Sequence, residues 1–339
     1  MLSQQTYAEL YDGNKPRLEH AQNYFLDGGK EPQLDELVAF YKKWRDFPEY
    51  GVIQKQEWHG SECIKKTVAV LCSKRGNSVY QRRVEHRIGV FEFLSRGDVE
   101  FFKFTESNPM ISMLFVTLTW KVQGRVSESW ETIGHYFNRW ITNLREKYGR
   151  ISYARVWEGT QKGYAHIHIM MDFHTSKFHG FKTLDAGNNF VWRISEKAEF
   201  EKSWPAFVDV RVVRTYSSVL RYLRKRIVEG TDKQDDQDAG DLTRALMWIF
   251  RKRSFALSKD LRDRLTDLIG ALRKSKRQVT LDGVEMKDVW VWRGVFSASE
   301  LGLDGKIWVV VLTEDQIPEI VKSPCKFGDR SGNVYMKYD

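Results

Sequence analysis

The stretch Val156-Trp-Glu-Gly-Thr-Gln-Lys-Gly-Tyr-Ala-His-Ile-His-Ile-Met170 decides the fold of the region around it. Its first residues are apolar and aromatic, which is typical of a β-strand, and residues 160–163 supply a tight turn. The largely apolar residues that follow predict a second strand, so the stretch predicts an antiparallel hairpin. Because successive side chains of a strand alternate between its faces, His166 and His168 project from the same face.

Two imidazoles on one face of a strand are a good start on a divalent metal site, because neutral imidazole is a common metal ligand. Glu158 lies just across the turn and can add a carboxylate oxygen if the strand register turns it to that face. The sequence does not determine this register. A histidine on an apolar strand is more often a hydrogen-bonded core residue than a ligand, so the His-x-His motif needs support from the rest of the chain.

The composition of the 339-residue chain predicts a folded protein with more than one structural region. Apolar residues make up 42% of the chain and aromatic residues 14%, which is ample material for a packed core. The net charge of +9 is compatible with nucleic-acid binding. Three cysteines without C-x-x-C spacing suit a reducing compartment. No run approaches the roughly 18 apolar residues of a membrane span, so we expect a cytoplasmic protein, in the host cytoplasm if it is viral.

Elements on both sides of the hairpin predict an α+β fold with a central antiparallel sheet flanked by helices. Residues 113–120 predict a strand with Thr117 and Thr119 on one face. An amphipathic helix is expected over 127–148, and a further strand over 207–213. The order strand, helix, strand, strand lacks the regular alternation of a doubly wound parallel sheet.

Residues 216–229 predict a helix with two distinct faces. At about 100° per residue, Tyr216 falls on the apolar stripe, whereas Tyr222 and Lys225 fall on the opposite face, one turn apart. Tyr216 is therefore most simply a core residue. On spacing alone, Tyr222 is a half-exposed aromatic residue and Lys225 a solvated cation.

The chain divides into three expected regions. Residues 96–230 form the central domain, 1–95 a mixed and partly helical N-terminal region, and 242–339 a C-terminal α+β region that can pack on the central domain. The acidic, turn-rich residues 230–241 predict a solvated loop at the boundary.

Outside the central elements, apolar periodicity predicts further helices and strands. We expect helices over 33–44, 80–94, 242–251 and 259–272, and strands over 64–72, 289–296 and 306–312. Residues 174–203 predict a loop followed by a helix. The arginines of residues 80–94 and the run Arg251–Arg253 can face either phosphate groups or solvent.

Three motifs occur in order along the chain. They are Phe115-Val-Thr-Leu-Thr119, His166-Ile-His168 with Glu158 eight residues before it, and Tyr222-Leu-Arg-Lys225. Together they resemble the motif set of the His-hydrophobic-His endonucleases, specifically the rolling-circle replication initiators of archaeal plasmids and viruses. The segment 204–214 is also similar to the residues that precede the tyrosine in those initiators, and the resemblance covers about residues 110–230.

This resemblance implies a central antiparallel sheet related to the RNA-recognition-motif topology, and metal-dependent nicking and religation of single-stranded DNA. His166, His168 and Glu158 would hold Mg²⁺ or Mn²⁺, which polarises the scissile phosphate. Tyr222 would attack the phosphorus and form a 5′-phosphotyrosine, and a later 3′-OH could reverse that step. Lys225 would stabilise charge or position the metal.

The resemblance also implies partners. Single-stranded and origin DNA would bind, and we expect a single-tyrosine enzyme because Tyr216 lies on the wrong helical face. The chain contains no G-x-x-x-x-G-K-[ST] motif, so a host helicase and polymerase would act with it, and no membrane would be involved. The expected DNA-contacting residues are Thr117, Thr119, Arg221, Arg82, Arg83 and Arg87.

Three other functions stay open on the sequence. A single-tyrosine transposase shares the His-x-His and tyrosine chemistry and would differ in joining transposon ends. A non-enzymatic DNA-binding regulator would use the basic helices and would keep its function after Tyr222→Phe. An unrelated metal hydrolase would cleave DNA without a covalent protein adduct.

Overall fold

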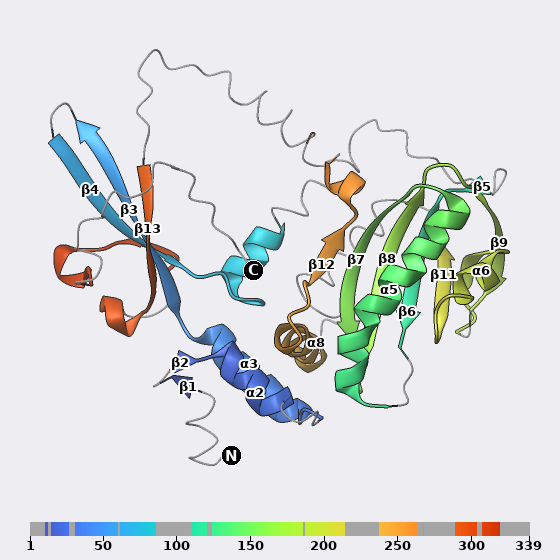
Figure 1. Cartoon of the computed structure of the whole chain (residues 1–339), viewed down its shortest axis with the longest axis horizontal. Helices are drawn as coiled ribbons and strands as arrows, with labels where there is room; N and C mark the ends of the chain where they lie inside the picture. The colour runs from blue at the N-terminus through green and yellow to red at the C-terminus, as the bar shows by residue number, and fades with distance from the viewer. Residues whose placement is uncertain are drawn as a thin grey trace. The chain divides into compact units, whose positions relative to one another are not determined.

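The computed structural model shows an α+β protein with antiparallel sheets flanked by helices, which confirms the expected fold class (Figure 1). Its contacts divide the chain into two compact units, residues 1–45 with 81–278 and residues 46–80 with 279–339. The structure describes residues 11–12, 15–26, 31–59, 62–85, 110–120, 124–185, 187–213, 237–263, 267, 289–303 and 307–318.

The larger unit is built on an antiparallel sheet with the strand order β11-β6-β8-β7-β12. All of its pairings between neighbouring strands are antiparallel, and β7 and β8 form the expected hairpin. The strands are β6 (Met113–Thr119), β7 (Ile151–Gly159), β8 (Ala165–Phe173), β11 (Val208–Val212) and β12 (Phe255–Leu257).

The long helix α5 (Val126–Tyr148) lies along the sheet (Figure 1). Its apolar stripe and the alternate apolar residues of β6 and β8, such as Val116 and Ile169, belong to one buried cluster. Two buried tryptophans of α5 also satisfy their indole N–H groups, because Trp130 donates to the carbonyl oxygen of Gly163 (2.7 Å) and Trp140 to that of Phe200 (2.8 Å). One face of the sheet is therefore committed to the core.

Three further helices of this unit contribute to the same core: α2 (Leu18–Leu26), α3 (Leu34–Asp46) and α8 (Gln237–Ile249). The start of α8 was expected to be a solvated loop, and this expectation was wrong for residues 237–241. Asp241 is buried, and its carboxylate accepts hydrogen bonds from Arg45 (2.8 Å) and Arg244 (3.2 Å). These cations offset the cost of burying the acidic side chain, and Arg45, so distant in sequence, could not be recognised as its partner.

A second antiparallel sheet of this unit has the order β10-β9-β5. It consists of β5 (Met110–Ile111), β9 (Phe178–Leu184) and β10 (Phe190–Ile194), and the short helix α6 (Lys197–Glu201) follows. The sequence predicted a loop in place of the β9–β10 hairpin, and only the helix was anticipated. The turn is closed by Asp185, whose Oδ1 accepts from the backbone N–H groups of Gly187 (2.9 Å) and Asn189 (3.0 Å).

The smaller unit is a sheet with the order β13-β3-β4-β14. Its strands are β3 (Glu49–His59), β4 (Glu62–Leu71), β13 (Val289–Ser297) and β14 (Val309–Val311). The sheet thus joins strands from the expected N-terminal and C-terminal regions, so the compact units cut across the consecutive regions 1–95, 96–230 and 242–339. Pairing between strands this far apart in sequence leaves no local signal.

The remaining described elements are short. They are β1 (Tyr11–Asp12), β2 (Lys15–Pro16), helices over 78–85 and 259–263, and the 3-10 helices η2 (Ser299–Leu301) and η3 (Glu314–Gln316). Of the helix expected over 80–94, the residues after 85 lie outside the described part of the chain. In the described ranges, no helix has both the length and the apolar character needed to cross a membrane.

Candidate functional site

The register of three strands brings the candidate ligands together on the sheet face opposite α5. Glu158 on β7 pairs directly with His166 on β8, and Thr119 on β6 pairs with the other side of His166. Thr117 pairs with His168, two residues further along the strands. Residues opposite each other in an antiparallel pair share a face, so all five side chains project to the same side. The register that the sequence left open therefore places Glu158 beside the histidines.

His168 is buried and held by contacts on both of its ring nitrogens. Its Nδ1 lies 3.0 Å from Thr117 Oγ1, and its Nε2 lies 2.6 Å from Glu158 Oε2. The ring of Phe115 stacks on it with a centroid distance of 5.6 Å. Because an ionised carboxylate only accepts hydrogen bonds, the Nε2 atom donates to Glu158, and in the neutral ring Nδ1 accepts from the threonine hydroxyl. The imidazole is therefore fixed in orientation.

His166 differs from its neighbour because its Nε2 atom is buried and finds no hydrogen-bond partner among the described residues. Its ring centroid lies 4.6 Å from that of His168. Burial lowers the pKa of His166 from 6.5 to about 3, since it disfavours the charged imidazolium, and the nearby His168 lowers it further. His166 is thus neutral at physiological pH and carries a lone pair that the described residues do not use.

Two neutral imidazoles and a carboxylate form a donor set that suits a divalent cation, Mn²⁺ better than Mg²⁺, which prefers oxygen ligands. Within the described ranges, no three His, Cys, Asp or Glu side chains already form a group able to hold a metal ion. Glu158 instead accepts a hydrogen bond from His168, and metal binding would replace that bond. The unused Nε2 atom of His166 and the shared face show that the residues fit such a cation chemically.

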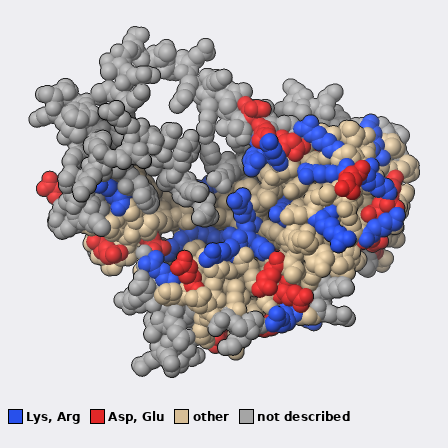
Figure 2. Space-filling model, in the orientation of Figure 1, with Lys and Arg blue, Asp and Glu red and all other residues tan. Residues whose placement is uncertain are grey.

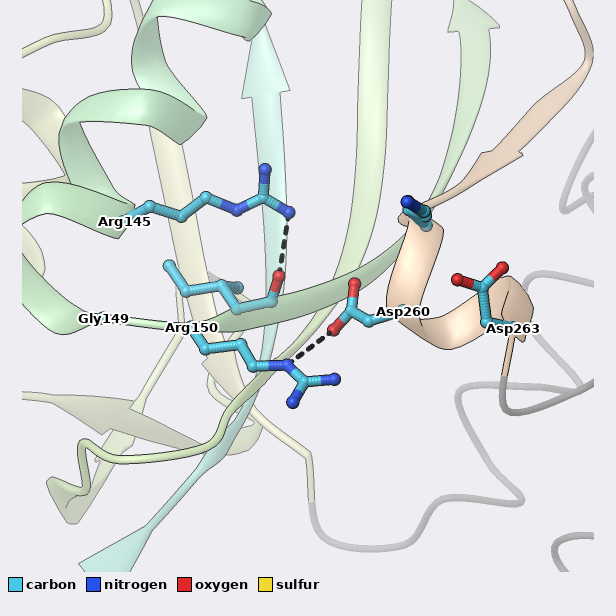
Figure 3. A pocket seen from close by; sticks show the side chains of 7 residues that line it. Arg145, Gly149, Arg150, Asp260 and Asp263 are labelled. Carbon is cyan, nitrogen blue, oxygen red and sulfur yellow. Dashed lines mark hydrogen bonds and ion pairs between the residues drawn. The ribbon is translucent and has the colours of Figure 1, made fainter.

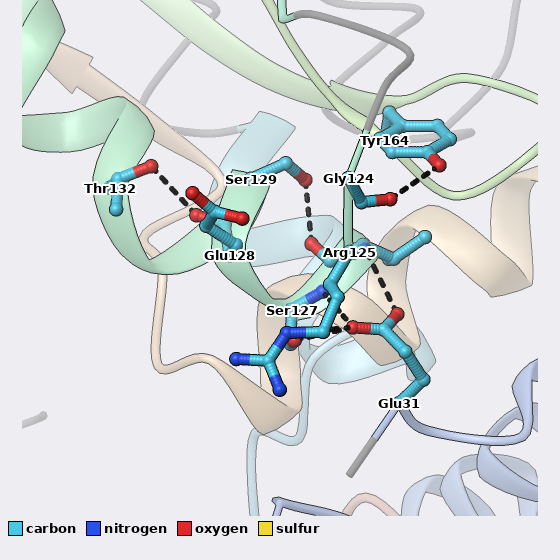
Figure 4. Close-up of polar contacts among 9 residues, drawn as sticks. Glu31, Gly124, Arg125, Ser127, Glu128, Ser129, Thr132 and Tyr164 are labelled. Atoms are coloured by element: carbon cyan, nitrogen blue, oxygen red, sulfur yellow. Dashed lines mark hydrogen bonds and ion pairs between the residues drawn. The ribbon is translucent and has the colours of Figure 1, made fainter. Parts of the chain in front are cut away.

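The turn between Glu158 and His166 is held by residues around the start of α5 (Figure 4). Ser129 Oγ accepts from the backbone N–H of Ala165 at 3.1 Å, and the Tyr164 hydroxyl donates to the carbonyl oxygen of Gly124 at 2.9 Å. Gly163 has a φ of 85°, and a Cβ there would lie 3.1 Å from Leu34 Cδ1. These contacts fix the hairpin that carries two of the candidate ligands.

The start of α5 is in turn capped by a side chain from far away in the sequence (Figure 4). The Glu31 carboxylate accepts from the backbone N–H of Val126 (2.8 Å) and from the Ser127 hydroxyl (2.6 Å). An acidic group at this end satisfies free backbone N–H groups and interacts favourably with the helix dipole. A helix start at Ser127 was predicted from the sequence, but nothing in the sequence indicated this cap.

Several expected residues lie elsewhere or outside the described part of the chain. Arg82 is exposed and Arg83 half-buried on the helix over 78–85. Arg251 donates to the side-chain oxygen of Gln22 at 2.7 Å, which gives it a structural role. The residues for which the structure describes no position are Arg87, Arg221, Tyr222 and Lys225.

The same sheet face continues onto β11 with residues that were not singled out from the sequence. Asp209 pairs with Thr117, and Arg211 pairs with Phe115. Arg211 Nε donates to Asp209 Oδ2 at 2.8 Å, and Arg193 on β10 also contacts the Asp209 carboxylate. Burial acts to raise the pKa of Asp209, but the two arginines outweigh it and hold the pKa below its usual value. The strict alternation of 208–212 would have revealed this pair.

A pocket of about 570 Å³ lies at the opposite end of β7 (Figure 3). Arg145 Nη2 donates there to the carbonyl oxygen of Ile151 at 3.0 Å, and Arg150 Nε lies 3.4 Å from Asp260 Oδ2. Ile151 is the first and Glu158 the eighth residue of the strand, so the pocket is roughly 20 Å from the histidine site. The pocket was not anticipated from the sequence, and it contributes no side chain to the histidine face.

The positive charge of the chain is not gathered into one patch on the face shown in Figure 2. Lys and Arg side chains lie interspersed with Asp and Glu over the described part of that face. Contacts with nucleic acid therefore have to be argued from individual residues, and the overall charge of +9 does not locate them.

Comparison with known proteins adds an independent observation. Residues 113–230 match a family model for replication-associated proteins of the ORF2 type, and the match begins with β6 and extends beyond β11 through the Tyr222 motif. No curated protein matches the chain. The match covers about a third of the sequence, and it contains all three motifs and the paired strands that carry the histidines. This central segment is therefore similar to replication-associated proteins, which supports a replication protein of the rolling-circle type.

Proposed function

We propose that the protein is a rolling-circle replication initiator of the His-hydrophobic-His type, similar to those of archaeal plasmids and viruses. It nicks single-stranded DNA at its origin and rejoins it through a tyrosine adduct. One observation carries the proposal: Glu158, His166 and His168 share one sheet face, opposite α5, within the segment that matches the replication-associated family. Sequence proximity alone could not establish that shared face.

The proposed roles follow from the contacts of each side chain. Thr117 orients His168 through Nδ1 and leaves Nε2 directed at the position that Glu158 now shares. His166 contributes a neutral nitrogen. These three ligands would hold Mg²⁺ or Mn²⁺, which when bound would polarise a non-bridging oxygen of the scissile phosphate.

Tyr222 and Lys225 enter the proposal from the sequence motif. The Tyr222 oxygen would attack phosphorus, the bond to the 3′ oxygen would break, and the products would be a 5′-phosphotyrosine and a free 3′-OH. A free tyrosine has a pKa near 10, so it needs activation, and the Lys225 ammonium would favour the phenolate or offset negative charge on phosphorus. A host helicase and polymerase would supply unwinding and synthesis.

A covalent-adduct assay tests the proposal. The full chain is incubated with single-stranded oligonucleotides tiled across the candidate origin of its own replicon, with Mn²⁺ or with EDTA, and any adduct is mapped by peptide mass spectrometry. We expect a metal-dependent adduct on Tyr222 that is lost in Tyr222→Phe and in His166→Ala. The matched control is Tyr216→Phe, which should keep the adduct.

Other results would point to the competing functions. Metal-dependent cleavage without an adduct would indicate a hydrolase that uses water. Binding to every oligonucleotide without cleavage would favour a DNA-binding regulator. Adducts that form only with transposon ends would favour a transposase.

A further inference from the structure

Arginine and aromatic side chains surround Asp209 at the β11 edge of the histidine face. We call the four residues Phe181, Arg193, Phe207 and Arg211 the arginine-aromatic strip. Phe181 pairs with Arg193 across the β9–β10 hairpin, so the two share a face, and Arg193 reaches β11 to contact Asp209 and the carbonyl oxygen of Val210 (3.0 Å). Strands of two different sheets thus contribute to one continuous surface.

Phe207 lies in line with the candidate metal ligands. Its carbonyl oxygen accepts from the Thr119 backbone N–H at 3.0 Å, and Thr119 pairs with His166, which pairs with Glu158. Since Phe207 directly precedes the buried Val208, alternation turns its side chain to the histidine face. Neighbouring strands are about 4.8 Å apart, so Phe207 is about 10 Å from His166. Its side chain is 60% exposed, which is unusual for phenylalanine beside a candidate active site.

The two arginines are held in place and still leave donors for a ligand. Asp209 neutralises only one of two guanidinium charges, and the Arg211 side chain remains 50% exposed. The Asp185 carboxylate, which lies close enough to interact with Arg211, already accepts from Gly187 and Asn189. A guanidinium whose orientation is fixed by a carboxylate and whose remaining N–H groups face solvent suits a phosphate ligand.

We propose that the arginine-aromatic strip binds single-stranded DNA and guides it toward the histidine site. Bases would stack on Phe207 and Phe181, and Arg211 would contact a backbone phosphate, a combination that single-strand-binding surfaces use. The choice of DNA as the ligand rests on the proposed function. Position is the strip's contribution, because a strand stacked on Phe207 lies two strands away from His166.

Binding can be measured without cleavage. The full chain is titrated into a fluorescein-labelled single-stranded DNA of about 16 nucleotides in EDTA, and fluorescence anisotropy gives Kd. We expect Phe207→Ala to weaken binding by about tenfold and Phe207→Trp to retain it. The matched control is Phe190→Ala, since Phe190 is 70% exposed on the same hairpin but on the opposite face of β10 from Arg193. Unchanged thermal unfolding shows that each variant is folded.

The arginine gives a second and independent readout. Arg211→Ala should weaken binding and lower the slope of log K against log salt by about 0.7, the value expected for loss of one phosphate contact to a single strand. Arg262→Ala, which removes a side chain that is 61% exposed, should leave both quantities unchanged. Phe207→Ala should leave the slope unchanged, because stacking releases no counterion.

The outcomes separate this proposal from the proposed function. Folded Phe207→Ala and Arg211→Ala variants that bind as tightly as the wild type would overturn the strip, even if the Tyr222 adduct forms. A wild-type protein that binds DNA through these residues but forms no adduct would overturn the nicking function and leave the strip intact. A wild-type protein that fails to bind the labelled DNA would overturn the strip as well.

Discussion

At the residue scale, the hydroxyl of Thr117 has the clearest supporting role, because it fixes the ring that Glu158 also contacts. Thr117→Val keeps the shape of the side chain and removes the hydrogen bond to His168 Nδ1. We expect Mn²⁺ affinity to fall by about tenfold, the lower end of the range for losing such a supporting contact. Calorimetric titration with Mn²⁺ measures the change.

A control for this substitution comes from α5. Thr142→Val also removes a hydroxyl, one that donates to the carbonyl oxygen of Asn138 on an exposed helix surface, and it should leave Mn²⁺ affinity unchanged. Equal affinity in Thr117→Val and the wild type would exclude the supporting role.

His166 should make stability depend on pH in the metal-free protein. Its folded pKa of about 3 is below the ordinary value of 6.5, so the unfolded chain binds the proton more readily, and stability is lost as pH falls from about 6.5 toward 3. Between about pH 7.5 and pH 5 the expected loss is about 2 kcal/mol. His166→Gln should reduce this loss.

Urea unfolding in EDTA at the two pH values gives the comparison. A pH dependence of the unfolding free energy that is the same in His166→Gln and the wild type would show that His166 titrates normally in the folded protein.

At the scale of the element, α5 depends on a cap that comes from another part of the chain. Glu31→Ala should lower the unfolding free energy by about 1 kcal/mol, because the backbone N–H of Val126 and the Ser127 hydroxyl lose their acceptor. Chemical denaturation measures the effect. Glu146→Ala, on the exposed surface near the other end of α5, is the matched control and should change stability little.

The elements also show what the sequence could and could not predict. Alternation and helical periodicity located β6, β7, β8 and α5, since each is long and has a single buried face. The β9–β10 hairpin was missed because its buried residues do not alternate regularly along β9 and β10. The start of α8 was missed because Arg45, a partner of Asp241, is distant in sequence.

The candidate site was predictable to a similar extent. Two imidazoles on one face followed from strand periodicity alone, but the position of Glu158 needed the register, and the Thr117 contact needed a third strand. The assignments of Tyr222 and Lys225 stay predictions, since they lie outside the described residues. Asp209 and Arg211 went unnoticed because motif spacing draws attention to known patterns and not to a neighbouring edge strand.

At the scale of the whole molecule, the smaller unit depends on segments from both halves of the sequence. Its core contains Tyr50 and Leu71 from the first segment and Leu301 and Leu312 from the second. Deletion of residues 279–339 should therefore expose apolar surface on residues 46–80, increase the binding of a hydrophobic dye, and make that segment sensitive to protease.

Limited proteolysis followed by mass spectrometry identifies the cleavage sites, and the full-length chain serves as the control. Protection of residues 46–80 in the shortened chain would show that β3 and β4 fold without β13 and β14. Cleavage spread evenly over residues 110–263 would show that the larger unit also requires the deleted residues.

The pairing of Glu158 with His166 has a consequence for how the chain can vary in length. Side chains of a strand obey parity, so one residue inserted between His166 and His168 would place the two imidazoles on opposite sides of the sheet. Two inserted residues would restore the side but displace one ring by about 7 Å along the strand. Insertions at the turn would leave this parity intact. The spacing of the motif is thus a counting rule imposed by the sheet, independent of which apolar residue stands between the histidines.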